Sequence, residues 1–275
     1  MSTSRRAFLG AMAAGAAAAQ TGGGVKKFVR YRHGGAVSYG LLEGEMVREI
    51  RGNMFEKYTT THTTRKLSEV KLLYPCEPPK AFAVGLNYKS HLGNRPGPKV
   101  PEIFYKPTTS IAGPEDNIVI PPGAMNVHYE AELVVVMKKR AKNVSVQEAP
   151  EYVFGYTCGN DVSERDWQKN DLQWWRAKGS DTFGPMGPSI AVGIDIPKSR
   201  LTLRLNGEVK QTQLISDLLF DTPAIVSWIS KHVTLEPGDV IFTGTPGSTS
   251  AMKPGDVVEV EIEGIGVLRN KVSAA

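Results

Sequence analysis

The sequence His128-Tyr-Glu-Ala-Glu-Leu-Val-Val-Val-Met137 places two glutamates at the start of an apolar run. Such a run is typical of a buried strand, and residues i and i+2 of a strand point to the same face. Glu130 and Glu132 are therefore expected side by side, where burial and like charge both oppose ionisation. A bound hard divalent cation, which prefers oxygen ligands, would relieve both costs. The motif alone leaves open the alternative of an exposed acidic pair at a strand end.

The composition is that of an ordinary globular protein. The chain has 275 residues, enough for one large domain or for one large and one small domain. Its 41% hydrophobic and 22% charged content is typical of a folded domain. The net charge of +5 is scattered, with no basic stripe that alternates with aromatic residues, so no nucleic-acid partner is expected.

Residues 1–20 resemble a Tat-type signal peptide. The segment Ser4-Arg5-Arg6-Ala7-Phe8-Leu9 has twin arginines before a Phe-Leu pair, and small residues follow up to Ala17-Ala18-Ala19. The apolar run is too short and too rich in Ala and Gly for a good transmembrane span. We expect a bacterial protein that is periplasmic or otherwise exported, with no stable membrane association after cleavage. The alternative is a tail that contains Arg-Arg by chance.

Two cysteines, Cys76 and Cys158, lie far apart in the chain and in no close-spaced ligand pattern. An exported protein could oxidise them. Because the sequence gives no geometry for a bridge, two buried free thiols are the favoured prediction.

The chain divides into a small N-terminal β domain at residues 25–75 and a larger domain at residues 76–275. Residues 26–58 contain short alternating strands separated by turns, and the polar stretch Thr59–Thr64 is expected to be a loop. Tyr74-Pro-Cys-Glu-Pro-Pro79 is a plausible linker, because prolines break strand pairing.

Strands also dominate the larger domain, so the expected fold class is mainly β (α+β). Asn206-Gly207 between two alternating runs is a strong hairpin signal. The best helix starts at Asp221-Thr-Pro, where Asp221 or Thr222 can cap the helix and Pro223 fits its first turn.

Asp161 follows the apolar strand predicted at residues 152–157 and could supply a third carboxylate beside Glu130 and Glu132. Mg²⁺ prefers octahedral oxygen coordination, so three protein ligands would leave positions for substrate and water. The metal would then act as a Lewis acid and a template. The alternative is that Asp161 only caps a helix or a turn.

Other residues could handle the substrate. Lys178 lies in a Gly- and Pro-rich loop and could stabilise an enolate or a carboxylate. Arg165 and Gln168, one helical step apart, could bind a carboxylate. His91, at a strand-to-helix corner, is a candidate general base. Thr243-Gly-Thr-Pro246 ends a strand and offers hydroxyls to an anion. Each of these also has a structural alternative as a solvated or turn residue.

These segments together resemble the fumarylacetoacetate hydrolase family. The matching segments occur in the family's order and are Val84–His91, Phe104–Pro107, His128–Glu132, Gly159–Gln168, Lys178–Pro185 and Pro237–Pro246.

The resemblance implies a fold, a cofactor and roles. The fold would be a mixed β-sandwich roll, with residues 76–275 as the catalytic domain, usually in a homodimer with Mg²⁺ or Mn²⁺. The implied metal ligands are Glu130, Glu132 and Asp161; the implied catalytic residues are His91 and Lys178; the implied substrate contacts are Arg165, Gln168, Lys106 and Thr245.

The implied activity is metal-dependent cleavage of a C–C bond in a small 2,4-dioxo acid of the acylpyruvate or fumarylpyruvate kind. Many hydrolytic members carry a glutamate three residues after the histidine that matches His91, and this chain has Asn94 there. Glu102 or a metal-bound hydroxide would have to substitute. The alternatives are therefore an isomerase or tautomerase, a hydratase or a decarboxylase of related 2-oxo acids, or an exported 2-oxo acid binding protein without turnover.

Overall fold

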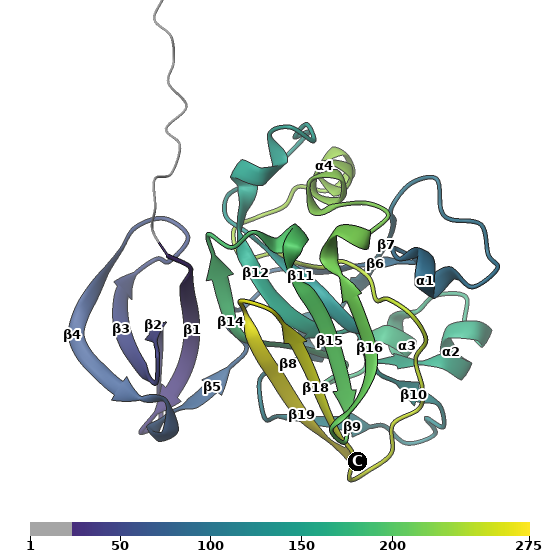
Figure 1. The fold of residues 1–275 in the computed structure, drawn as a ribbon, viewed down its shortest axis with the longest axis horizontal. Coiled ribbons are helices and arrows are strands. Elements are labelled where there is room, and N and C mark those ends of the chain that lie inside the picture. The colour runs from purple at the N-terminus through teal and green to yellow at the C-terminus, as the bar shows by residue number, and fades with distance from the viewer. Residues whose placement is uncertain (1–23) are drawn as a thin grey trace, which may run out of the picture.

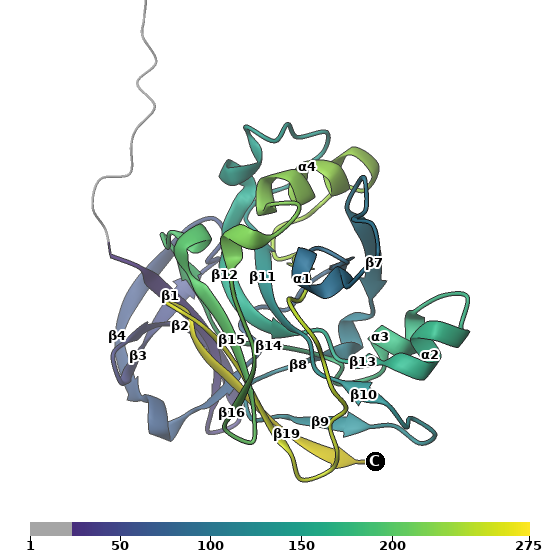
Figure 2. The same cartoon turned by 45° about the vertical axis from the view of Figure 1, so that its right-hand side comes forward.

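The computed structural model describes residues 24–275, and the export signal predicted at residues 1–20 lies outside them. The N-terminal strands lie at one end of the molecule and the short helices α1, α2 and α3 at the other (Figures 1 and 2). A search of residues 24–275 for a helix long and apolar enough to span a membrane finds none.

The largest sheet of the fold is mixed and has 12 strands. Its main path is, in order, β4 (Tyr58–Lys66), β3 (Met46–Gly52), β2 (Ala36–Glu43), β1 (Lys26–His33), β14 (Gly184–Val192), β12 (Val153–Asn160), β11 (Ala131–Met137), β17 (Val240–Phe242), β6 (Ala81–Gly85) and β7 (Glu102–Lys106). Off this path, β5 (Lys71–Leu73) pairs with β1 and β8 (Ile111–Ala112) pairs with β14. The predicted apolar strand is β11, and all of its residues are buried.

A second sheet of five strands packs on the first. Its order is β16 (Glu208–Leu214), β15 (Arg200–Leu205), β18 (Val257–Ile262), β19 (Gly266–Ala274) and β9 (Asn117–Ile120). Strands β11, β12 and β14 of the large sheet face β15, β18 and β19 of the small one. Leu133, Leu201 and Val260 meet in the core between them. The expected mainly β sandwich is confirmed.

The remaining elements are short. They are the strand pair β10 (Val127–His128) and β13 (Ser163–Glu164), the helices α1 (Lys89–Leu92), α2 (Arg165–Asn170), α3 (Trp175–Gly179) and α4 (Thr222–His232), and the 3-10 turns η1 (Leu67–Glu69), η2 (Thr108–Ser110), η3 (Ala149–Tyr152), η4 (Ile196–Lys198) and η5 (Ile215–Asp217).

The predicted hairpin and the predicted helix are both present. Asn206 and Gly207 join β15 to β16 with positive φ angles of 53° and 83°, which this kind of turn requires. Asp221 caps α4 by accepting a hydrogen bond of 2.9 Å from the backbone N–H of Ala224. Helix α4 then packs Ile225 against β6 and β17.

The N-terminal segment differs from expectation at one point. Residues 59–64 are not a loop but part of β4, which pairs with β3 as the outermost strand of the large sheet. Their polarity reflects the exposed edge, where threonine still favours extended backbone. In addition, β1 pairs with β14, so the N-terminal strands continue the sheet of the larger domain.

Cys76 and Cys158 are both buried and free, as predicted. Burial raises the pKa of each thiol to about 12.

Candidate active site

The three carboxylates meet because β11 and β12 are antiparallel neighbours. Ala131 at the start of β11 lies opposite Asn160 at the end of β12, so Glu130 precedes one strand where Asp161 follows the other. The backbone N–H of Asp161 donates to the carbonyl of Glu130 at 2.9 Å, and the backbone N–H of Glu130 donates to Asn160 Oδ1 at 2.8 Å. Carboxylate oxygens of Glu130, Glu132 and Asp161 lie within 4.8 Å of one another.

All three carboxylates are buried, with exposed fractions of 3% or less. Burial, which has the largest effect, and the negative charges of Asp161 and Glu130 raise the pKa of Glu132 well above its usual value. Burial alone would also raise the pKa of Glu130, but the nearby cations Lys178 and Arg165 outweigh it and lower that pKa. Glu132 is thus the carboxylate whose charge the protein alone compensates least.

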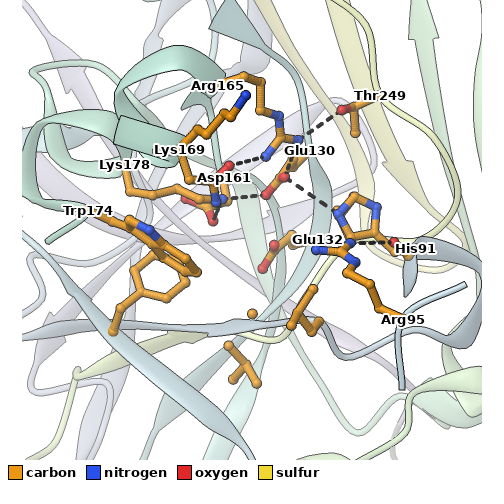
Figure 3. Close-up of a pocket in the computed structure, with 16 residues that line it drawn as sticks. His91, Arg95, Glu130, Glu132, Asp161, Arg165, Lys169, Trp174, Lys178 and Thr249 are labelled. Atoms are coloured by element: carbon orange, nitrogen blue, oxygen red, sulfur yellow. Dashed lines mark hydrogen bonds and ion pairs between the residues drawn. The ribbon is translucent and has the colours of Figure 1, made fainter. Parts of the chain in front are cut away.

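Two buried lysines form ion pairs with the cluster. Lys178 Nζ donates to Glu130 Oε2 and to Asp161 Oδ2, each at 2.6 Å. Burial lowers the pKa of Lys178, but the carboxylates of Asp161 and Glu130 outweigh it and raise the pKa overall. Figure 3 shows Lys178 and Arg165 reaching Glu130 from different directions.

Lys106 is placed differently from the expected substrate contact. Its ammonium is fully buried beneath Asp161, to which it donates at 2.7 Å, and it also donates to the carbonyls of Lys178 and Phe183. Burial lowers its pKa in spite of Asp161. Lys106 is absent from the residues that line the cavity described below, so it holds a metal-ligand candidate in place instead of meeting the substrate.

Arg165 and Gln168 lie on α2, and both line the cavity described below. Arg165 Nη1 donates to Gln168 Oε1 at 2.8 Å, and Arg165 Nη2 donates to Glu130 and to Thr249 Oγ1. Glu164 caps the helix by accepting from the backbone N–H of Trp167 at 2.6 Å. The guanidinium therefore already serves Glu130 as well as facing the cavity.

His91, on α1, faces the carboxylates from the side opposite Lys178. Its Nδ1 lies 2.6 Å from the carbonyl oxygen of Gly247, which can only accept, so Nδ1 carries the proton. In the neutral tautomer that this contact selects, the lone pair is on Nε2, which lies 4.0 Å from Glu130 Oε1. The geometry presents Nε2 as the proton-accepting atom at the carboxylates (Figure 3).

A cavity of about 470 Å³ opens over this cluster. It is lined by the three carboxylates and by five other residues singled out from the sequence, His91, Arg165, Gln168, Lys178 and Thr245. Arg95, Lys169, Thr249, Phe104 and Trp174 also line it. The rings of Phe104 and Trp174 meet edge to face at 5.4 Å and form an aromatic wall. Within residues 24–275, the cavity is lined by no carboxylate other than the three of the cluster.

The loop after β17 supplies contacts that the sequence did not reveal. The backbone N–H of Gly244 donates to Glu132 Oε2 at 2.8 Å. Gly244 has a φ of +106°, and a Cβ there would lie 2.7 Å from Asn87, so the close approach requires glycine. Asn87 Nδ2 in turn donates to the carbonyl of Thr243 at 2.7 Å. Only the Thr-Gly-Thr sequence had indicated this loop.

The donor set fits a hard divalent cation. Three convergent oxygen ligands without nitrogen or sulfur donors suit Mg²⁺ or Mn²⁺. Burial, and then the charges of Asp161 and Glu130, raise the pKa of Glu132, and a cation bound beside it would offset both effects.

Comparison with known proteins agrees with this site. Residues 80–273 match the family described as fumarylacetoacetate (FAA) hydrolase C-terminal, and residues 26–75 match the family described as Rv2993c-like, N-terminal. A mitochondrial oxaloacetate tautomerase of Bos taurus is 42% identical over 220 residues, which is 74% of this chain and 70% of that protein.

Solved structures agree as well. A 5-carboxymethyl-2-hydroxymuconate delta-isomerase from Mycobacterium smegmatis is 40% identical, with a TM-score of 0.86 over 90% of this chain and 100% of that one. A maleylpyruvate hydrolase from Sphingobium sp. SYK-6, in complex with manganese(II) and pyruvate, is 26% identical, with a TM-score of 0.76 over 90% of this chain and 99% of that one. The chain is an enzyme of the fumarylacetoacetate hydrolase family.

Proposed function

We propose that this chain catalyses the metal-dependent keto–enol tautomerisation of a small 2-oxo dicarboxylate, of which oxaloacetate is the simplest. The observation that carries the proposal is that His91 is the one imidazole in the cavity lining of residues 24–275, and that the carboxylates in this lining are only the three metal-ligand candidates, which leaves no further carboxylate to pair with it. A proton shift between carbon and oxygen needs one such group, whereas hydrolysis must both activate water and protonate a carbon leaving group.

Glu102, the side chain that could replace the missing glutamate, does not line the cavity and is exposed at the start of β7. Asn94, at the position of that glutamate, is also exposed and outside the cavity lining. C–C bond hydrolysis, the activity expected first from the sequence, therefore stays a prediction with less structural support than tautomerisation.

The carboxylates Glu130, Glu132 and Asp161 would hold Mg²⁺ or Mn²⁺. The bound cation would supply Lewis-acid chemistry by polarising the 2-oxo carbonyl. Lys178 would lie beside the enolate oxygen and offset its charge, while His91 Nε2 would take the proton from the adjacent carbon and return it. Phe104 and Trp174 would exclude water and offer a flat apolar surface to the planar enol.

The cationic rim favours a second carboxylate on the substrate. Arg95 and Lys169 line the cavity, and neither forms an ion pair with another residue in the 24–275 range. Arg95 is anchored by hydrogen bonds to the carbonyls of Leu92 and His91 at 3.0 and 3.1 Å. These cations, together with Gln168, would bind the carboxylate far from the metal. The relatives that act as an oxaloacetate tautomerase and a delta-isomerase support this choice.

The test supplies the enol form of oxaloacetate and follows the keto form by coupling to malate dehydrogenase. We expect Mg²⁺-dependent acceleration above the spontaneous rate, without formation of pyruvate. Pyruvate from oxaloacetate would indicate decarboxylation instead, and pyruvate from acetylpyruvate would indicate C–C hydrolysis. Substrate-dependent thermal stabilisation with no product from any 2-oxo acid would favour the binding-protein alternative.

His91→Asn is the matched variant, because its amide can still donate to the Gly247 carbonyl while the proton-accepting atom is lost. The expected loss is about 10²- to 10⁴-fold in kcat, with unchanged Mg²⁺ affinity. A kcat close to that of the wild-type protein would contradict the role of His91. The homodimer and the exported location remain predictions.

A further inference from the structure

Gln211 is the only buried residue of β16, an edge strand that is otherwise exposed or partly exposed. A register shift in the hairpin causes this. Arg204 pairs with Val209, but Leu203 pairs with Gln211, so Lys210 is an extra residue on β16. The bulge therefore turns Gln211 to the buried face of Leu203, where a regular register would have put Lys210.

The buried amide of Gln211 uses its full donor capacity. Its Oε1 accepts from the backbone N–H of Ala131 at 3.0 Å, and its Nε2 donates to Thr245 Oγ1 at 2.9 Å and to the carbonyl of Pro246 at 2.5 Å. The reverse orientation of the amide would set oxygen against the Pro246 carbonyl and nitrogen against the Ala131 N–H. Gln211 is thus a fixed donor toward Thr245.

This contact determines the direction of the Thr245 hydroxyl. Because Thr245 Oγ1 accepts from Gln211, its own hydrogen is left for another acceptor, and Thr245 lines the cavity. Among residues 24–275, the one side-chain hydrogen bond found for this hydroxyl is the bond it accepts from Gln211. An oxygen of a bound ligand would accept its hydrogen.

The position of the contact connects it to the carboxylates. Ala131, which Gln211 holds, lies between Glu130 and Glu132, and Gly244, beside Thr245, donates to Glu132. Gln211 therefore fixes Thr245 relative to two metal-ligand candidates.

We infer that Gln211 is a positioning residue that makes Thr245 a hydrogen-bond donor to an oxygen of the 2-oxo acid head group, and so helps select oxygen-rich, anionic substrates. The inference rests on the proposed function for the identity of the ligand. Because Gln211 acts through Thr245, loss of Gln211 should weaken ligand binding only in a protein that still has the Thr245 hydroxyl.

The experiment measures oxalate binding to the Mg²⁺-loaded protein by calorimetry, together with KM and kcat for the enol of oxaloacetate. Oxalate is a planar dianion with the oxygen pattern of a 2-oxo acid enolate, and its binding requires no turnover. The variants are Thr245→Val, Thr245→Ser, Gln211→Met, the double variant Gln211→Met with Thr245→Val, and Gln211→Glu.

A hydrogen bond to a charged ligand predicts that Thr245→Val weakens oxalate binding by about 10- to 100-fold, whereas Thr245→Ser retains it. Gln211→Met should raise KM more than it lowers kcat and add nothing to Thr245→Val. Gln211→Glu keeps the contact to Ala131 but offers the Thr245 hydroxyl an acceptor, so it should also weaken oxalate binding.

Additive losses in the double variant would show that Gln211 only supports the fold, and would overturn the inference. Full oxalate affinity in Thr245→Val, or no oxalate binding by the wild-type protein, would overturn it even if the Gln211 variants failed to fold. Thr245-dependent oxalate binding without tautomerase activity would instead refute the proposed function and leave this inference standing.

Discussion

Replacing Lys178 with methionine should destabilise the metal-free protein and strengthen its binding of Mg²⁺. The side chain is 4% exposed and pairs with Glu130 and Asp161, whose side chains are 5% and 2% exposed. Methionine conserves much of the volume but leaves two buried carboxylates without their shared cation. A divalent cation at the carboxylates would then replace the lost charge.

The magnitude follows from the burial. Breaking a buried ion pair by removing one partner costs about 3–5 kcal/mol, which lowers the Tm of a domain of this size by about 6–20 °C. A lysine ammonium and a divalent cation about 4 Å apart repel by about 8 kcal/mol at an effective dielectric constant near 20, twice the value for two unit charges. If relaxation and solvent remove three quarters of that repulsion, about 2 kcal/mol remains, and the variant binds Mg²⁺ about 30-fold more tightly than the wild-type protein.

The assay compares thermal unfolding in EDTA and in increasing Mg²⁺, with Mg²⁺ affinity from calorimetry. Lys178→Met should recover most of its lost Tm as Mg²⁺ saturates. Lys106→Met is the matched comparison, because that ammonium also serves the carbonyls of Lys178 and Phe183, which a metal at the carboxylates would not replace. Its Tm should stay low in Mg²⁺. Unchanged or weaker Mg²⁺ binding by Lys178→Met would refute the idea that lysine and metal share the same carboxylates.

Three further outcomes are expected. Because the pKa of Glu132 is raised and a metal ligand must lose its proton, Mg²⁺ affinity should rise with pH by up to about tenfold per unit, accompanied by proton release in calorimetry; a pH-independent affinity would contradict this. With pKa values of about 12, Cys76 and Cys158 should resist a disulfide reagent at pH 8 until denaturant is added. Above pH 9 the free energy of unfolding should fall, because the thiols of the unfolded chain ionise at a lower pH than those of the folded protein. Rapid reaction of the folded protein with the reagent would count against their burial. Gly244→Ala should lower both Tm and Mg²⁺ affinity, because its Cβ would lie 2.7 Å from the nearest side-chain carbon, whereas Gly247→Ala, with no atom within 4 Å, should leave Mg²⁺ affinity unchanged.

Local patterns predicted the parts of the fold that depend on neighbouring residues. The i, i+2 spacing predicted that Glu130 and Glu132 lie close together, as they do although Glu130 precedes β11; Asn206-Gly207 predicted the hairpin, and Asp221 predicted the start of α4. In each case the deciding contacts lie within a few residues along the chain.

Long-range pairing decided the rest. Asp161 reaches Glu130 only because β11 and β12 pair in the register of Ala131 with Asn160. The family resemblance implied a substrate contact for Lys106, but in the fold its buried ammonium donates to Asp161. Gln211 carries no motif, and its position depends on a bulge that spacing did not reveal.

The most direct measurement titrates the EDTA-treated protein with Mn²⁺ and records bound metal by electron paramagnetic resonance alongside ketonisation of enol-oxaloacetate. We predict that one Mn²⁺ binds per chain and that the ketonisation rate rises in proportion to bound metal. The Glu132→Gln variant should lose both the bound Mn²⁺ and the ketonisation activity. Full activity in excess EDTA, or one bound Mn²⁺ retained by Glu132→Gln, would show that the three carboxylates are not the metal centre of this enzyme.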